Sequence, residues 1–202
     1  MNYKLVDNRI EFTDEKLTEN STNMISVIST YKFTKYMEQM PDGISILRSN
    51  ETRYTKLDVK NKYLQGVIYM PSKKDIFNHT RFGYLIFNRN ILFIDSSDTV
   101  INIIEQLRHS SIDMPTIWKF YYHFLNMLID RDLLYLQDIE NSLSTFENNL
   151  LDGGIDEYNQ RDIIYIRKKL FNQYRFYTQL FEIEHKLNEG DHITLTPNED
   201  KL

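Results

Sequence analysis

The spacing of hydrophobic positions changes part-way along the chain. In the first half it favours strands. Residues 54–59 (YTKLDV) place Thr55, Leu57 and Val59 on one face and polar side chains on the other, which predicts a half-buried strand. Short apolar runs predict the other strands of a sheet, at residues 24–29, 64–70, 83–87 and 91–95.

The segments around these strands are predicted from their turn and helix signals. Residues 88–90 (NRN) predict a tight hairpin between the last two strands, because Asn tolerates positive φ. Residues 30–40 can form a helix that ends at the Pro-Asp-Gly of residues 41–43. For the first twenty residues the sequence does not decide among a strand, a turn and a loose tail.

After about residue 98 the hydrophobic spacing becomes three and four, as in amphipathic helices. Asp98 is predicted to cap a helix over residues 99–107. Pro115 opens a second helix, which is predicted as one continuous element over residues 115–151 and ends at the Asp-Gly-Gly of residues 152–154.

A third helix, predicted over residues 156–188, runs back along the second. The pair is expected to form an antiparallel helical hairpin of coiled-coil character. At a rise of about 1.5 Å per residue, such arms reach about 50 Å, which is more than the width of a small domain. Part of the hairpin should therefore project beyond the sheet or pack on another subunit.

Charge is divided between the two arms of this hairpin. Residues 129–160 carry eight acidic residues against one basic residue, a net charge of −7, and residues 161–186 carry six basic residues against three acidic ones, a net charge of +3. The opposite charges can flank the seam and set its pairing. The acidic arm can also raise the local concentration of cations. Both interpretations stay open.

The composition is that of a folded cytosolic protein, with 41% hydrophobic residues, 26% charged residues and no Cys. The lack of Cys excludes disulfide scaffolds and thiolate metal sites. The N-terminus has no apolar core of a signal peptide, and no apolar run reaches the roughly 18 residues of a membrane span. The net charge of −5 disfavours nucleic acid as a partner.

Together the elements predict an α/β protein in which an α/β/α layered sheet domain precedes the long antiparallel helical hairpin. The predicted divisions are residues 1–112 for the sheet domain with flanking helices, 113–190 for the hairpin, and 191–202 for a link and the first turn of a further helix. Thr196 and Glu199 have the spacing of a capping box with Pro197 at the first helical position, although chance also produces this pattern.

The motifs of common enzyme classes are absent: the chain has no glycine-rich phosphate loop, no GxSxG and no HExxH. No two of the histidines share a helix face at a spacing of four; they are His79, His109, His123, His185 and His192. The aromatic residues around Trp118 are expected in the core or an interface. The sequence therefore predicts a scaffold or sensor rather than a catalyst.

A polar loop at residues 72–75 (SKKD), followed four residues later by His79, connects two predicted strands. A carboxylate there can take part in an oxygen-ligand site for Mg²⁺, which keeps most of its waters and needs few protein ligands. Asp75 is thus the candidate metal ligand. The alternative is an ordinary solvated loop.

Three stretches, in this order, resemble the cytoplasmic region of the CorA-like divalent-cation transporters. Residues 54–71 (YTKLDVKNKYLQGVIYMP) are similar to part of its sheet. Residues 129–153 are similar to its acidic helix, with Glu140 and Glu147 seven apart, and residues 162–187 (DIIYIRKKLFNQYRFYTQLFEIEHKL) to its returning helix. The resemblance extends over roughly residues 25–202.

The resemblance implies a regulatory, cation-sensing domain at the cytoplasmic face of the cell membrane. In this family a long stalk helix follows the returning helix and leads into two membrane spans, the first of which ends in a Gly-Met-Asn motif. That motif is absent here, so the membrane helices are expected beyond Leu202.

The resemblance also implies a homopentamer that carries Mg²⁺, and in many members Co²⁺ or Ni²⁺, with cations between the domains holding the closed state. The isolated domain is expected as a monomer or dimer. Asp75 matches, by loop position, the domain-side carboxylate of such a site, whose partner is expected on the stalk. A ZntB-like zinc transporter domain, a stand-alone soluble adaptor and an unrecognised enzyme remain alternatives, and the physiological ion and the direction of transport stay open.

Overall fold

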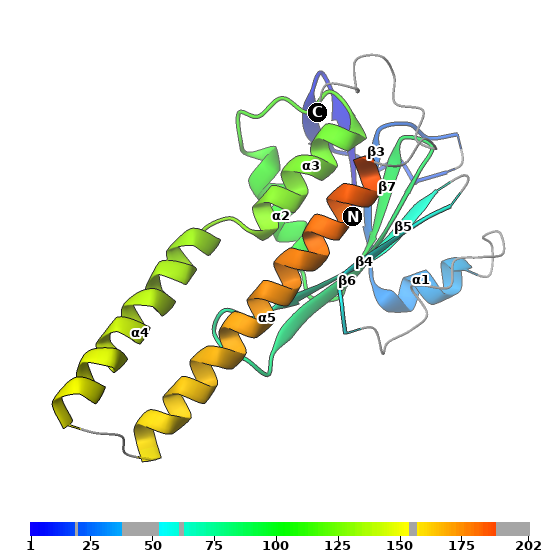
Figure 1. The fold of residues 1–202 in the computed structure, drawn as a ribbon. Helices are drawn as coiled ribbons and strands as arrows, with labels where there is room; N and C mark the ends of the chain where they lie inside the picture. The colour runs from blue at the N-terminus through cyan, green and yellow to red at the C-terminus, as the bar shows by residue number, and fades with distance from the viewer. Residues whose placement is uncertain (19, 38–52, 61–62, 154–156, 189–202) are drawn as a thin grey trace.

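The computed structural model describes residues 1–18, 20–37, 53–60, 63–153 and 157–188 (Figure 1). The strands are β1 (Asn2–Val6), β2 (Arg9–Phe12), β3 (Met24–Ile28), β4 (Lys56–Val59), β5 (Leu64–Pro71), β6 (His79–Phe87) and β7 (Asn90–Ile94). The helices are α1 (Thr30–Met37), α2 (Thr99–Arg108), α3 (Ile117–Leu128), α4 (Asp132–Gly153) and α5 (Glu157–Asn188).

All seven strands form one sheet in the order β2-β1-β3-β7-β6-β5-β4. The β3–β7 pair is parallel, and every other neighbouring pair is antiparallel. The first twenty residues, whose structure the sequence left open, include the β1–β2 hairpin. The predicted β6–β7 hairpin is confirmed, but its turn has two residues, Asn88 and Arg89, both with positive φ, and Asn90 belongs to β7.

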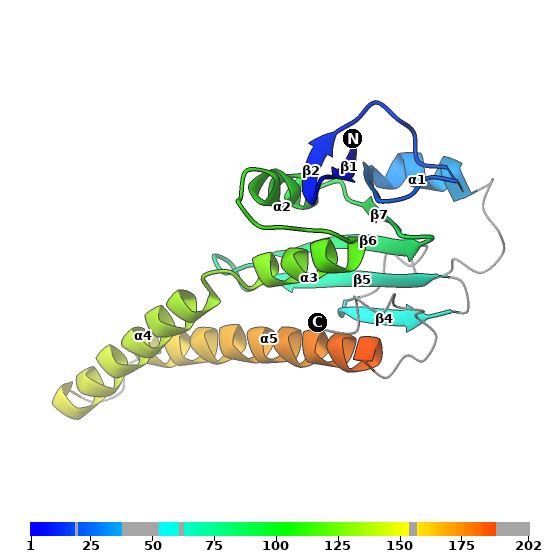
Figure 2. The same ribbon diagram turned by 90° about the horizontal axis from the view of Figure 1, so that it is seen from above.

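Helices cover both faces of the sheet (Figures 1 and 2). Phe33 of α1 packs on one face against Leu85, Leu92 and Ile94. The opposite face is covered by α2, α3 and α5, whose buried side chains belong to a second, larger cluster. The predicted α/β/α layering is therefore confirmed.

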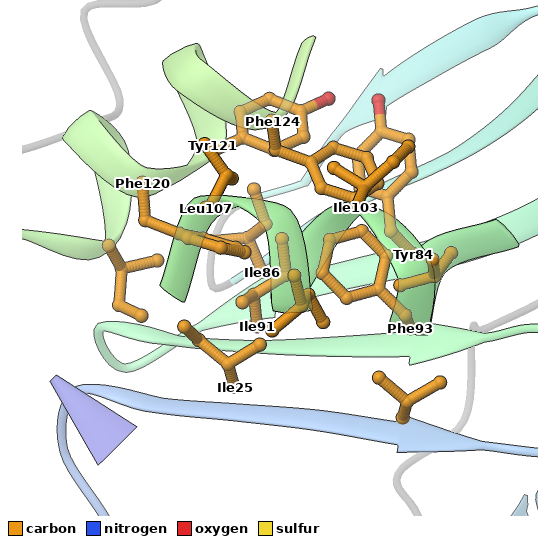
Figure 3. Close-up of a cluster of buried hydrophobic side chains, with 14 of the residues drawn as sticks. Ile25, Tyr84, Ile86, Ile91, Phe93, Ile103, Leu107, Phe120, Tyr121 and Phe124 are labelled. Atoms are coloured by element: carbon orange, nitrogen blue, oxygen red, sulfur yellow. The ribbon is translucent and has the colours of Figure 1, made fainter. Parts of the chain in front are cut away.

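Aromatic and aliphatic side chains together fill the core beneath α2 and α3 (Figure 3). Phe124 stands above Phe93, with ring centroids 4.6 Å apart, and Tyr84 meets Tyr121 at 5.3 Å. Both tyrosines are almost fully buried, and this burial raises the pKa of each phenol above its usual value. The sheet, α2 and α3 thus share one core, to which α5 adds Phe176 and Ile183.

The prediction of one helix over residues 115–151 is wrong. α3 ends at Leu128 and α4 begins at Asp132, because Arg131 adopts a left-handed conformation with φ of 61°. Tertiary packing explains the break: α3 lies on the sheet core, whereas α4 turns away from the sheet (Figure 1). The hairpin therefore consists of α4 and α5, and the division between residues 112 and 113 stays a prediction.

Asp98 does not cap α2 through its side chain, contrary to the prediction. It precedes the helix with a φ of 60° and makes no side-chain capping bond. Asp95 does this work instead: its Oδ2 accepts from the Val100 backbone N–H at 2.9 Å, and its Oδ1 accepts from the backbone N–H and hydroxyl of Ser97, both at 2.7 Å. The Asp95 carboxylate is buried at the end of β7.

Replacing Asp95 with Asn is expected to lower the free energy of unfolding by about 1–2 kcal/mol, because an amide cannot accept on both sides and buried donors lose a partner. Asp98→Asn is the matched control. It makes the same charge change, and Asn tolerates the left-handed backbone, so its effect should stay within about 0.5 kcal/mol. Urea unfolding of both variants checks this; equal losses would contradict the assignment.

The two helices of the hairpin extend well past the edge of the sheet, as expected (Figures 1 and 2). The C-terminal half of α5 runs along β4 and β5, and its N-terminal half projects with α4. Large apolar side chains are exposed on the two helices, among them Leu133, Leu134, Phe171, Tyr174 and Phe181. In the part of the chain that the structure describes, no helix is both long and apolar enough to span a membrane.

Several predictions fall on residues outside the described ranges. They are the helix end at residues 41–43, the turn between the two arms after Gly153, and the link with its capping box at residues 191–202.

Candidate functional site

The loop between β5 and β6 carries Asp75 and is built around that side chain. Asp75 Oδ1 accepts from the Phe77 backbone N–H at 2.9 Å, and Oδ2 accepts from Nδ2 of Asn78 at 2.7 Å. The backbone N–H of Asp75 donates to the Ser72 hydroxyl at 3.3 Å. The carboxylate is partly exposed, so it organises its own loop while keeping access to solvent.

This loop docks on the hairpin. Lys73 forms an ion pair with Asp132, at the start of α4, and its Nζ also donates to the Asp130 carbonyl at 3.2 Å. From α5, the Tyr165 hydroxyl donates to the Lys74 carbonyl at 3.3 Å. The Asp75 loop thus contacts both arms of the hairpin close to where α4 leaves the sheet.

Asp132 is the centre of this junction. Its side chain is only 7% exposed, and Oδ2 accepts from the Tyr177 hydroxyl at 2.6 Å and from Nε2 of Gln173 at 3.0 Å. Gln173 also donates to the Tyr177 oxygen at 2.8 Å. Burial, and then the bond to Asp132, raise the pKa of Tyr177. The junction therefore joins the Asp75 loop, α4 and α5 through one buried carboxylate.

In the described part of the two arms, their opposite charges are not paired with each other. Among the described residues, no ion pair joins α4 to α5. Polar contacts across the two arms include the bonds of Asp132 and the approach of the Lys169 ammonium to within 6.0 Å of the Tyr135 ring centre. Asp132 itself is paired with Lys73. Asp138, Glu140 and Glu147 are exposed to solvent.

The structure does not gather metal ligands around Asp75. In the described ranges, no three His, Cys, Asp or Glu residues are close enough to hold a metal ion together. His79 stacks on Tyr69 with ring centroids 4.3 Å apart, and His123 lies on α3, where burial lowers its pKa. Asp75 remains a candidate metal ligand, but the described part of this chain does not supply the other ligands of a site.

Sequence analysis missed Asp132 and its partners. A signal was present, because an Asp in the first turn of an acidic, periodic segment is typical of a helix N-terminus. The apolar period, however, runs through residues 129–131 without interruption and hid the break. Lys73, Gln173 and Tyr177 lie far from Asp132 in the sequence, and their meeting has no local signal.

Comparison with solved structures relates this architecture to transporter domains. The complete structure of the CorA magnesium transporter from Methanocaldococcus jannaschii matches 98% of this chain with a TM-score of 0.72 and 17% identity. The soluble domain of that CorA matches with a TM-score of 0.66 over 98% of this chain and 83% of its own length. This chain has the CorA soluble-domain fold.

The same fold occurs in the ZntB cytoplasmic domain from Vibrio parahaemolyticus, which matches 98% of this chain and 83% of its own length with a TM-score of 0.63 and 14% identity. No protein-family model and no curated protein matches the sequence. The chain spans 65% of the length of the complete CorA structure. At these identities the likeness establishes the fold, and function is argued separately.

Proposed function

We propose that this chain is the cation-sensing cytoplasmic domain of a CorA-like transporter of divalent cations, with Mg²⁺ as its principal ion. The observation that carries the proposal is the shared fold over 98% of the chain with the soluble domain of a protein named as a magnesium transporter. In this proposal transport itself belongs to membrane helices outside the matched 65% of CorA. No reaction is assigned to the chain.

The donor set around Asp75 fits a hydrated Mg²⁺ ion. It does not fit an ion that the protein encloses on all sides. Mg²⁺ is commonly bound by one or two carboxylates and several waters, and Asp75 supplies one partly exposed carboxylate. The exposed Lys74 beside it opposes the approach of a cation. Binding is therefore proposed to be weak in a single chain and to require a second carboxylate from another copy or from the stalk.

The exposed apolar side chains of the hairpin support assembly into a homo-oligomer. The resemblance to the CorA-like family suggests that this oligomer is a pentamer. Burying such side chains against another copy removes apolar surface from water. A cation held between copies would favour the arrangement in which its ligands meet, and its loss would release it. Through Lys73, the Asp75 loop contacts Asp132. A cation bound at the loop would therefore affect the position of the hairpin base.

Two alternatives follow from the same fold. A ZntB-like domain would respond to Zn²⁺ instead. The V. parahaemolyticus structure supports this alternative only through its shared fold. The lack of Cys and the absence of a three-ligand cluster in the described residues weigh against a tight structural zinc site. A stand-alone adaptor would use the exposed apolar side chains for a different protein and would show no cation effect.

Millimolar Mg²⁺ is expected to increase self-association of the chain, and Asp75→Asn is expected to abolish most of that increase, because a neutral amide attracts the cation far less. Sedimentation velocity over a range of protein concentrations, with and without Mg²⁺, measures this. Parallel titrations with Co²⁺, Ni²⁺ and Zn²⁺ rank the ions.

Asp138→Asn is the matched control, since it removes an exposed carboxylate from α4 and should leave the Mg²⁺ effect unchanged. Self-association that does not change with Mg²⁺ would favour the alternative of a stand-alone adaptor. A response to Zn²⁺ alone would favour the zinc alternative. Tight binding of one Mg²⁺ per monomer would contradict the interface mechanism.

A further inference from the structure

A pocket of about 250 Å³ lies between α5 and the β5–β6 end of the sheet. In Figure 2, α5 runs alongside β4, the strand at this edge of the sheet. The polar side chains that line the pocket are those of Arg53, Asn78, His79, Asn172, Arg175 and Gln179. The aromatic rings of Tyr69, Phe77 and Phe176, together with Pro71 and Ile76, complete its wall. The pocket adjoins the Asp75 loop but does not include Asp75.

The charge of this pocket is opposite to that of the protein. The chain carries 29 acidic and 24 basic residues, yet the described residues that line the pocket include two arginines and no Asp or Glu. Among the described residues, neither Arg53 nor Arg175 forms an ion pair. Two guanidinium groups that share a concave site without a carboxylate attract an anion.

Hydrogen bonds hold the pocket in shape and leave donors available. Nη2 of Arg175 donates to the Arg53 carbonyl at 2.9 Å, which uses one of the five N–H donors of its guanidinium. Oε1 of Gln179 accepts from the Thr55 backbone N–H at 2.8 Å, so its amide donors remain for another partner. His79 is oriented by stacking on Tyr69. Arg53, Arg175 and Gln179 therefore keep donors for a ligand, whereas Nδ2 of Asn78 and Nδ2 of Asn172 already donate within the protein.

We propose that this pocket binds a phosphate group, either as inorganic phosphate or as part of a small phosphomonoester. Planar guanidinium groups pair with phosphate oxygens in two-bond geometry, which a chloride ion cannot reproduce. The pocket volume suits a phosphoryl group with a small substituent, and the aromatic wall suits an organic substituent. This inference does not rest on the cation-sensing proposal.

Calorimetric titration of the whole chain at constant ionic strength tests the proposal, with inorganic phosphate, ribose 5-phosphate and adenosine monophosphate as probes. Saturable binding of one ligand per chain is expected for at least one probe. Arg53→Gln and Arg175→Gln should each weaken that binding about tenfold or more, because each removes a charge-assisted pair. Arg53→Gln keeps the carbonyl that Arg175 contacts, so it removes a charge without breaking the wall.

Arg167→Gln is the matched control: it makes the same charge change on an exposed position of α5 outside the pocket and should leave the affinity unchanged. Tighter binding of a phosphomonoester than of phosphate would identify an organic occupant, and the reverse order would identify the free ion. No saturable binding of any probe, or an equal loss in all three variants, would overturn the proposal.

Discussion

Replacing Asp132 with Ala is expected to lower the free energy of unfolding by about 3 kcal/mol. The carboxylate is 7% exposed and accepts from Tyr177 and Gln173 while it pairs with Lys73. Without it, the Lys73 ammonium loses its ion pair, and the Gln173 amide and the Tyr177 hydroxyl lose the carboxylate oxygen that accepts from both. Lys73 is itself 35% exposed and can regain water, so the expected loss lies at the low end for a broken buried ion pair.

Urea unfolding followed by circular dichroism measures this loss, with Asp138→Ala as the control. Asp138 is an exposed acid on the same helix, and its removal should change the free energy of unfolding by less than about 0.5 kcal/mol. Hydrogen exchange should also accelerate in the first turns of α4, because the docking of that end depends on the junction. Equal stability of the two variants would show that the junction contributes little.

Gly66→Ala is expected to destabilise the sheet core by about 3 kcal/mol or more. Gly66 lies opposite Tyr84 in the β5–β6 register, and an added Cβ would collide with Cζ and Oη of that ring. The ring is fully buried and packed against Tyr121, so it has no free space into which to move. Relief requires a shift of β5 or of the ring, and both disturb the core.

A double-mutant cycle with Tyr84→Leu tests this explanation. Leu lacks the ring atoms that meet the new Cβ, so Gly66→Ala in the Tyr84→Leu background should cost less than about 1 kcal/mol. Thermal unfolding of the four proteins supplies the coupling energy. An equal cost of Gly66→Ala in both backgrounds would mean that the backbone of β5, rather than the tyrosine, requires glycine.

Local patterns predicted the elements whose signals are local. The alternation of residues 54–59 and the apolar runs of β5, β6 and β7 placed these strands to within a few residues. A tight turn was predicted at residues 88–90 because it depends on the φ preference of Asn, and the structure has it at Asn88 and Arg89 alone. Burial of one face and turn geometry act over a few neighbouring residues, so the sequence contains their causes.

Errors arose where two local solutions competed. Asp98 directly precedes α2 and was predicted as its cap. The end of β7 points the Asp95 carboxylate at the helix N-terminus instead. The hydrophobic period across residues 129–131 is compatible with a continuous helix, and the docking of α3 on the sheet selected the break at Arg131.

By itself, the sequence determined the α/β class, most of the strands, the long helical hairpin and the polar loop of Asp75. Each depends on periodicity, turn chemistry or composition. Only the tertiary structure decided the parallel β3–β7 contact, the Lys73–Asp132 junction and the basic pocket of Arg53 and Arg175. These features join residues from distant parts of the chain, and their partners are chosen by the packing of whole elements, which no local pattern encodes.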